Sequence, residues 1–166
     1  MALITEYRTP ATPDYGAVEI ADANTGITDD DALKTARSQV VAGGSQHLYL
    51  YSLQREIDVE VVIRIWDAPQ PCPADAEGVV SVTLRSDAGA LEINQFTYGP
   101  AGEMTLPRPG VYEGRASWNG RQETADYCDM CHERSVEEEW DLPRLRQARR
   151  QCPVQEQYVI DLWFRD

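Results

Sequence analysis

One short segment has the residue types and spacing for cofactor or metal chemistry. Residues 127–135 read YCDMCHERS, and Cys128, Cys131 and His132 stand in the C-x-x-C-H order that attaches haem in c-type cytochromes. Covalent haem requires export from the cytosol and usually a helical scaffold built around the cofactor. The first 16 residues lack a basic region, an apolar region and a cleavage site, so they do not resemble an export signal. We therefore do not expect haem.

Zinc is the alternative that the same residues leave open. Two thiolates separated by two residues can bind one ion. His132 or Cys152 could be the third ligand, and Cys72 or His47 the fourth. Strong zinc sequences contain two close pairs of ligands, whereas this chain contains one. We expect ordinary thiols and no cofactor, with a zinc-stabilised domain as the alternative; its ligands would be Cys128, Cys131, His132 and Cys152.

The charge of the chain excludes two classes of partner. The 166 residues include 28 acidic and 15 basic side chains, which give a net charge of −13. Nucleic-acid backbone and anionic membranes attract basic proteins, so we expect neither direct nucleic-acid binding nor membrane docking. An acidic surface favours solubility, and it also attracts a basic protein partner. With no apolar run of about 20 residues and no export signal, we expect a cytoplasmic protein.

Motifs for catalysis are missing from the sequence. It contains no nucleophile elbow, phosphate-binding loop, H-E-x-x-H, EF-hand or dinucleotide fingerprint. His47 lies among tyrosines in a predicted strand, where a partly buried sheet residue is commoner than a catalytic base. We expect a protein that is not an enzyme, and a small ligand-binding or enzymatic sandwich with an unmarked pocket remains the alternative.

Alternation of apolar and polar residues predicts a mainly β fold. Short alternating runs separated by Gly, Pro, Asn and Asp are typical of an antiparallel β-sandwich, here of seven or eight strands in a single domain over 1–166. The predicted strands are 17–23, 45–54, 58–66, 78–86, 89–94, 102–107, 110–118 and 157–164. Their apolar faces predict a core that includes Val61, Ile63, Ile65, Val82, Leu84, Ile160 and Leu162.

Two segments break the alternation and predict helices. Residues 28–41 read as one short helix, with Thr28 as N-cap and an end at Gly43 and Gly44. Residues 119–156 form a helical insertion between the last two strands, with Ser135 and Asp141 as candidate caps. We expect Trp163 to pack beneath this insertion.

The order of several stretches resembles a known family. They are YGAVEIADA (15–23), TDDDALKTA (28–36), HLYLYSLQREIDVEVVIRIW (47–66), MTLPRPGVYEGRASW (104–118) and QYVIDLWF (157–164). This pattern of strands is similar to competence protein J and its relatives, small inhibitors of a competence DNA-entry nuclease. The helical insertion departs from the shorter pattern of that family.

The resemblance implies a partner binder without catalytic residues, whose acidic surface covers the active site of a basic nuclease or toxin. A nuclease site must attract phosphates, and an acidic protein can occupy that field and associate quickly. The densest acidic stretches in the part of the chain that resembles the family are the candidate binding residues: Asp29, Asp30, Asp31, Glu56, Asp58 and Glu60.

Overall fold

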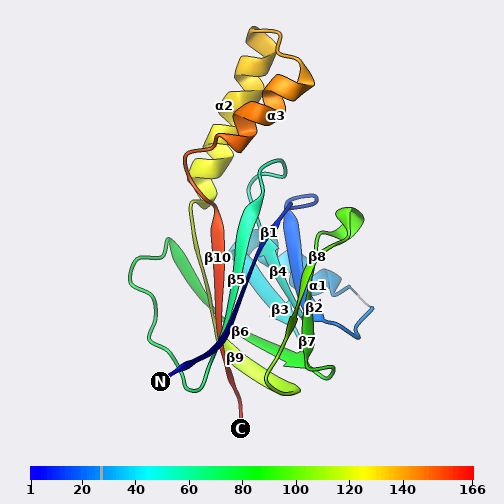
Figure 1. The fold of residues 1–166 in the computed structure, drawn as a ribbon, viewed down its shortest axis with the longest axis vertical. Coiled ribbons are helices and arrows are strands. Elements are labelled where there is room, and N and C mark those ends of the chain that lie inside the picture. Colours follow the sequence, from blue (N-terminus) through cyan, green and yellow to red (C-terminus); the bar gives the residue numbers. More distant parts are fainter. Residues whose placement is uncertain (27) are drawn as a thin grey trace.

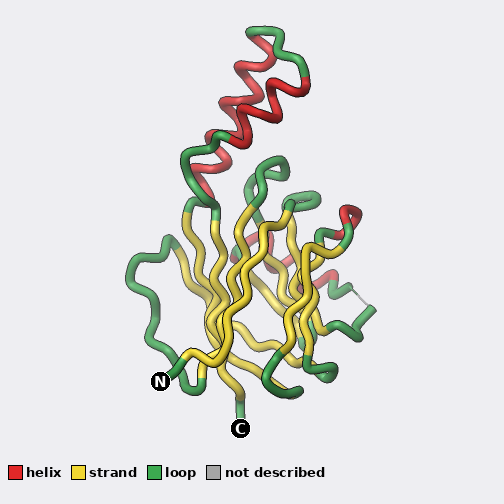
Figure 2. Tube along the Cα trace, viewed as in Figure 1, coloured by secondary structure: helices red, strands yellow, loops and turns green. Residues whose placement is uncertain are grey.

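Two five-stranded β-sheets packed face to face form the body of the protein (Figures 1 and 2). The computed structural model describes residues 1–26 and 28–166. Sheet A has the order β1 (Leu3–Ala11), β5 (Val59–Trp66), β10 (Gln157–Phe164), β9 (Gly110–Asn119), β6 (Gly78–Ser86). Sheet B has the order β3 (Val41–Gly44), β4 (His47–Tyr51), β2 (Ala17–Asp22), β7 (Ala90–Asn94), β8 (Pro100–Thr105). The expected mainly β sandwich is confirmed.

One strand pair departs from the antiparallel pattern. Strands β5 and β10 run parallel at the centre of sheet A, with Val61 opposite Tyr158 and Ile63 opposite Ile160. Parallel neighbours need a long crossover, and here residues 67–156, from the β5–β6 connector to the end of the helical insertion, separate the two strands. All other strand pairs of the two sheets are antiparallel.

The core lies between the sheets and is made by the inward face of each strand. The seven core residues predicted from alternation are all buried, each with at most 7% of its surface exposed. Leu48 and Leu50 of β4 face them from sheet B, while Tyr49 points to the other side of that sheet. A period of two therefore located the core correctly in the strands that are buried on one face.

The first helix is shorter than expected, and two strands were not predicted. Helix α1 spans Asp30–Gln39, its N-cap is Asp29 rather than Thr28, and it ends at Val40, whose φ is 74°. Val41–Gly44, expected to finish the helix, is instead strand β3, which pairs with β4. Strand β1, the edge of sheet A, was also missed, because its alternation involves mostly polar and half-exposed side chains.

The helical insertion projects from the sandwich as a two-helix arm (Figure 1). It consists of α2 (Arg121–Glu137) and α3 (Leu142–Arg150), between β9 and β10. The Asp141 cap is confirmed, because its carboxylate accepts a hydrogen bond from the Arg144 amide at 2.9 Å. The Ser135 cap is wrong, since that residue lies within α2. No helix of the described residues is long and apolar enough to cross a membrane.

The expected position of Trp163 beneath the arm is also wrong. Strand β10 begins at the arm and ends at the opposite side of the sandwich (Figure 1). Trp163 is the seventh of its eight residues, so about 20 Å of extended strand separate it from the base of the arm. The Arg115 guanidinium lies 5.7 Å from the centre of the Trp163 ring, and it donates a hydrogen bond to the Gln70 carbonyl. This buried tryptophan is therefore next to the β5–β6 connector.

A buried carboxylate fixes the base of the arm to the sandwich. Glu156 is fully buried and accepts hydrogen bonds from Ser52 Oγ at 3.0 Å, Gln54 Nε2 at 3.1 Å and the Tyr158 hydroxyl at 2.5 Å. Its pKa is raised because burial penalises the charged form. At the other foot of the arm, Arg121 Nε donates to the Tyr51 carbonyl at 2.9 Å. One foot of the arm therefore contacts the segment after β4, and the other contacts the last residue of β4.

Candidate partner-binding surface

The two predicted acidic stretches lie at opposite ends of β4. Asp29, Asp30 and Asp31 line a hollow of about 540 Å³ together with His47, at the start of that strand. Glu56 and Asp58 follow its other end, where they line a hollow of about 430 Å³ with three arginines of α3. The structure therefore does not bring the six candidate residues into one patch.

Of the first stretch, Asp29 has a structural role and its two neighbours do not. Asp29 Oδ1 accepts a hydrogen bond from the Ala32 amide at 3.0 Å, and the Asp29 amide donates to the Tyr49 hydroxyl at 2.9 Å. A side chain at Gly44 would meet the Asp29 carboxylate, so glycine there leaves room for this cap. Asp30 and Asp31 are exposed and form no ion pair among the described residues.

The second stretch is already occupied by partners within the chain. Glu56 forms an ion pair with Arg149 at 3.5 Å, and Asp58 accepts a hydrogen bond from Thr12 Oγ1 at 2.6 Å. Glu60 lies on the outer face of sheet A, where Arg8 Nη1 and Gln157 Nε2 each donate to it at 2.9 Å. A partner would have to displace these contacts, so this stretch is the weaker candidate.

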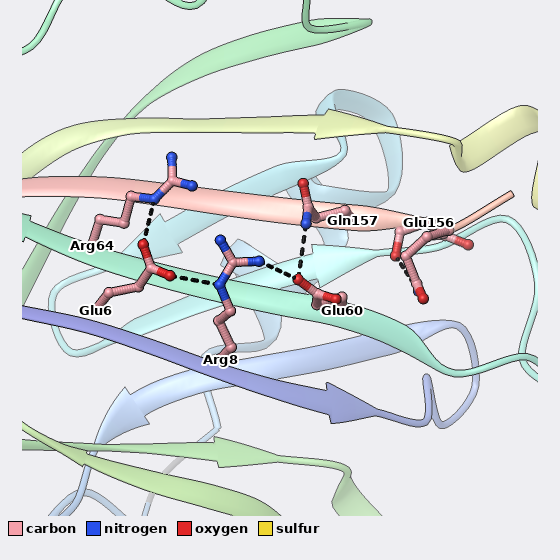
Figure 3. Close-up of polar contacts among 7 residues, drawn as sticks. Glu6, Arg8, Glu60, Arg64, Glu156 and Gln157 are labelled. Carbon is pink, nitrogen blue, oxygen red and sulfur yellow. Dashed lines mark hydrogen bonds and ion pairs between the residues drawn. The ribbon is translucent and has the colours of Figure 1, made fainter.

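Glu60 belongs to a row of alternating charges on sheet A (Figure 3). Glu6 accepts from Arg8 Nε and from Arg64 Nε, and Arg8 also reaches Glu60. The hydrogen bonds from Arg8 and then Arg64 hold the pKa of Glu6 below its ordinary value. The carboxylates along this row are neutralised by Arg8 of β1 and Arg64 of β5.

The outer face of sheet B has a different charge pattern. Its five strands, all within the described residues, contain no lysine or arginine, whereas Glu19, Glu92 and Glu103 lie on this face. The register places Ala21 opposite both His47 and Glu92, and Glu92 opposite Glu103. Like charges directly opposite one another destabilise a sheet. The sequence analysis did not predict that Glu19, Glu92 and Glu103 share this face.

The same side of sheet B carries α1, and so it also carries the first acidic stretch. Ala32 and Ala36 of α1 pack on Ala42 and Tyr49. The row from His47 to Glu92 crosses two strand spacings, about 10 Å, so the α1 N-terminus and the sheet carboxylates share one face. We call Asp30, Asp31, Glu92 and Glu103 the acidic face. The only basic residues of α1 beside it are Lys34 and Arg37.

A buried polar cluster supports the centre of the acidic face. His47 Nδ1 lies 3.1 Å from Glu19 Oε2, and Asn94 Nδ2 donates to Glu19 Oε1 at 3.1 Å. His47 also stacks on Tyr49, whose pKa is raised chiefly by burial. His47 is 8% exposed, which agrees with its predicted role as a partly buried sheet residue. Glu19 is thus a supporting residue, and the carboxylates available to a partner are the half-buried Glu92 and the exposed Asp30, Asp31 and Glu103.

The cysteine segment folds as part of α2. Cys128 and Cys131 are buried, Cys152 is half-buried after α3, and His132 is exposed. Among the described residues no group of three or more potential ligands is arranged to hold a metal ion. Burial raises the pKa of the Cys128 thiol, which disfavours the thiolate needed for metal binding or nucleophilic attack. Ordinary thiols remain the prediction, and metal analysis of protein purified without a histidine tag would test it.

Comparison with known proteins identifies the fold. No protein-family model and no curated protein sequence matches the chain. Solved structures with this fold include ComJ of Bacillus subtilis, described as an inhibitor of the DNA-degrading activity of NucA, with a TM-score of 0.60 and 12% identity over 99% of this chain and 98% of ComJ. The protein described as crocagin biosynthetic gene J matches with a TM-score of 0.53 and 16% identity over the full length of both chains. The chain therefore has the ComJ-like fold that the sequence resemblance predicted.

Proposed function

We propose that this protein is an inhibitor-type binding protein, without catalytic activity, whose partner is a basic nuclease. Two observations support the proposal. The fold is similar to that of ComJ, which inhibits a DNA-degrading nuclease. The acidic face offers carboxylates that have no ion-pair partner among the described residues.

The physical basis of inhibition is competition for the field of the nuclease active site. A nuclease holds phosphates with positive charge, and carboxylates on a rigid sheet can occupy the same positions. Long-range attraction raises the association rate and is screened over about 8 Å at physiological salt. In this proposal the encounter takes place in the cytosol, where free cysteines stay reduced.

The observation that carries the proposal is the absence of lysine and arginine from the five described strands of sheet B, where Glu92 and Glu103 form a like-charged pair. A like-charged cross-strand pair costs stability, and a cationic partner relieves that cost on binding. Among the described residues neither glutamate forms an ion pair within the chain, so no internal contact has to be broken first.

The test is capture followed by an activity assay. The immobilised protein is incubated with lysate of its own cells, and captured proteins are assayed for degradation of plasmid DNA with and without added free protein. We expect a basic nuclease whose activity falls stoichiometrically. The variant Glu92→Lys/Glu103→Lys should lose capture. The matched control Asp75→Lys/Asp166→Lys makes the same charge change at exposed carboxylates outside sheet B and should retain capture.

Two results would overturn the proposal. One is the absence of any nuclease among proteins captured by the unmodified chain but not by the acidic-face variant. The other is capture of a nuclease that continues to degrade DNA at saturating protein, since binding would then leave the active site open.

A further inference from the structure

Three loops at the arm end of the sandwich carry large apolar side chains that are exposed to solvent. Tyr15 lies between β1 and β2 and is 73% exposed, and Leu53 follows β4 and is 46% exposed. Tyr98 is 63% exposed and lies in the short helix η1 (Phe96–Tyr98), between β7 and β8. Figure 1 shows all three connections at the end of the sandwich from which the arm projects. We call Tyr15, Leu53 and Tyr98 the apolar rim.

Hydrogen bonds between the loops hold the rim together. The buried Asp14 carboxylate accepts hydrogen bonds from the Thr97 hydroxyl and from the Thr97 amide, the latter at 2.8 Å. The Ser52 amide donates to the Gly16 carbonyl at 2.6 Å. These four residues are the sequence neighbours of the three rim residues, so the loop between β1 and β2 lies between the other two loops.

The backbone of the rim is fixed in conformations that ordinary side chains rarely adopt. Tyr15 has a φ of 52° and Phe96 a φ of 51°, and they are two of the four described residues other than glycine with a positive φ. Such conformations cost energy, persist only where surrounding contacts hold them, and cluster at functional sites. The bonds of Asp14 to Thr97 supply those contacts. The rim is therefore formed before a partner arrives, which lowers the entropy cost of binding.

The rim adjoins the acidic face of sheet B. Helix η1 connects β7 to β8, the two strands that carry Glu92 and Glu103. Glu92 lies two residues before the end of β7, a distance of about 7 Å along an extended strand. The ring of Phe96 stacks on Tyr49 of the outer face, with 6.4 Å between the ring centres. A partner seated on the acidic face therefore meets η1 at its edge.

Charge indicates which kind of partner the rim fits. Residues 12–16, 52–54 and 95–99, which make up the three loops, contain no lysine or arginine. Tyr15 and Leu53 line a hollow of about 330 Å³, and Arg55 is the one basic residue among those that line it. An anionic partner at the rim would be repelled by the neighbouring acidic face, whereas a basic partner would be attracted by it.

We propose that the apolar rim anchors the same basic nuclease that the acidic face attracts. The inference rests on the proposed function, because it describes the second half of that binding site. Long-range attraction between charges raises mainly the association rate. Tyrosine is enriched among the residues that dominate binding energy, and its burial in an interface mainly slows dissociation. The two surfaces thus divide the binding reaction between encounter and retention.

Other exposed apolar side chains fit this role less well. Met130, Val136 and Leu142 lie on the arm, and the four arginines of α3 beside them would repel a basic partner. Leu3 and Ile4 lie at the start of β1. About 26 Å of extended strand separate Leu3 from the end of β1 that leads into the rim.

Dissociation kinetics test the anchor. The nuclease captured by the unmodified chain is immobilised on a biosensor, and full-chain variants flow over it. Tyr15→Ala/Tyr98→Ala should dissociate at least about tenfold faster at a nearly unchanged association rate. Tyr15→Phe/Tyr98→Phe keeps both rings and should dissociate far more slowly than the alanine variant. The matched control Leu3→Ala/Ile4→Ala removes exposed apolar side chains at the opposite end of the sandwich and should keep the original dissociation rate.

The outcomes separate the rim from the proposed function. Thermal unfolding first confirms that each variant is folded. An alanine variant that dissociates like the unmodified chain, or a control that dissociates as fast as the alanine variant, would overturn the rim and leave the inhibitor proposal standing. A loss confined to the association rate would also overturn it, because an anchor acts after the encounter. Absence of any captured nuclease would overturn both proposals.

Discussion

The outer faces of the two sheets differ in how their carboxylates are balanced. The strands of sheet A carry four acidic residues and four arginines, and Glu6, Arg8, Glu60 and Arg64 form one connected row (Figure 3). The strands of sheet B carry no lysine or arginine, and two of their glutamates oppose each other directly. The same protein thus neutralises one face and leaves the other charged.

This difference explains why the net charge alone says little about binding. Exposed ion pairs contribute little to stability. A carboxylate that already contacts an arginine attracts a distant basic partner only weakly, because the two charges largely cancel. The acidic residues that matter for long-range attraction are those without an internal counter-charge. On sheet B these residues are Glu92 and Glu103, which are 11 residues apart in sequence and adjacent in the sheet.

The largest effect is expected at the buried carboxylate of sheet B. Glu19→Ala removes the acceptor for Asn94 Nδ2 and the contact of His47 Nδ1, and each buried group left without a partner costs about 1–3 kcal/mol. Urea denaturation measures the loss. Glu19→Gln keeps one amide oxygen as acceptor and should cost less. Equal unfolding free energies of the alanine variant and the unmodified protein would show that Glu19 does not support this face.

The second effect separates capping from binding at the start of α1. Asp30→Lys/Asp31→Lys should slow association with the captured nuclease about tenfold and flatten its salt dependence, because these side chains are exposed and have no ion pair within the described part of the chain. Asp29→Ala should instead cost about 1 kcal/mol of stability through the lost cap, with a normal association rate. Stopped-flow kinetics and thermal unfolding check both. An unchanged rate in the double variant would remove α1 from the interface.

The sequence predicted this part of the surface only where acidic residues are consecutive. Asp29–Asp31 stand out as a run, whereas Glu19, Glu92 and Glu103 are isolated letters that the register of β2, β7 and β8 brings to one face. A usable signal was present nonetheless. Residues 9–33, 38–54 and 86–107 contain no lysine or arginine, and these segments supply the strands of sheet B.

The third effect tests the like-charged pair with a single substitution. Glu103→Lys turns the contact with Glu92 into an opposite-charge pair, so it should raise the unfolding free energy by about 0.2–1 kcal/mol while it slows association. Glu6→Lys makes the same change on sheet A, where Arg64 would lose its carboxylate partner and Arg8 would keep only Glu60. It should lower stability and leave association unchanged. Identical behaviour of the two variants would remove the distinction between the faces.

The sequence predicted the helices and strands that bury one face, and it failed for those that do not. Strands β5 and β10 alternate strongly, and their core residues followed from that period. Strand β3 has four residues, two of them glycine, and it exists because β4 offers a free edge. A capping sequence at Ser135 predicted that a helix begins there, but Ser135 lies within the long helix α2. Packing of Cys128 and Cys131 overrides that local signal.

The smallest effect is expected from the neutralised row of sheet A, and it depends on pH. The pKa of Glu6 is lowered by hydrogen bonds from Arg8 and Arg64, so the folded state favours the charged carboxylate more than the unfolded state does. The contribution is therefore present above the ordinary value of 4.5 and is lost as the pH falls through the lowered pKa. Because solvent screens this exposed row, Glu6→Gln should cost no more than about 1 kcal/mol at pH 7. The difference from the unmodified protein should shrink as the pH falls below the ordinary value of 4.5 and through the lowered pKa, as measured by urea denaturation over a series of pH values. A cost that stays constant with pH would mean that shape rather than charge makes the contribution, and the contrast between the two faces would then lose its electrostatic basis.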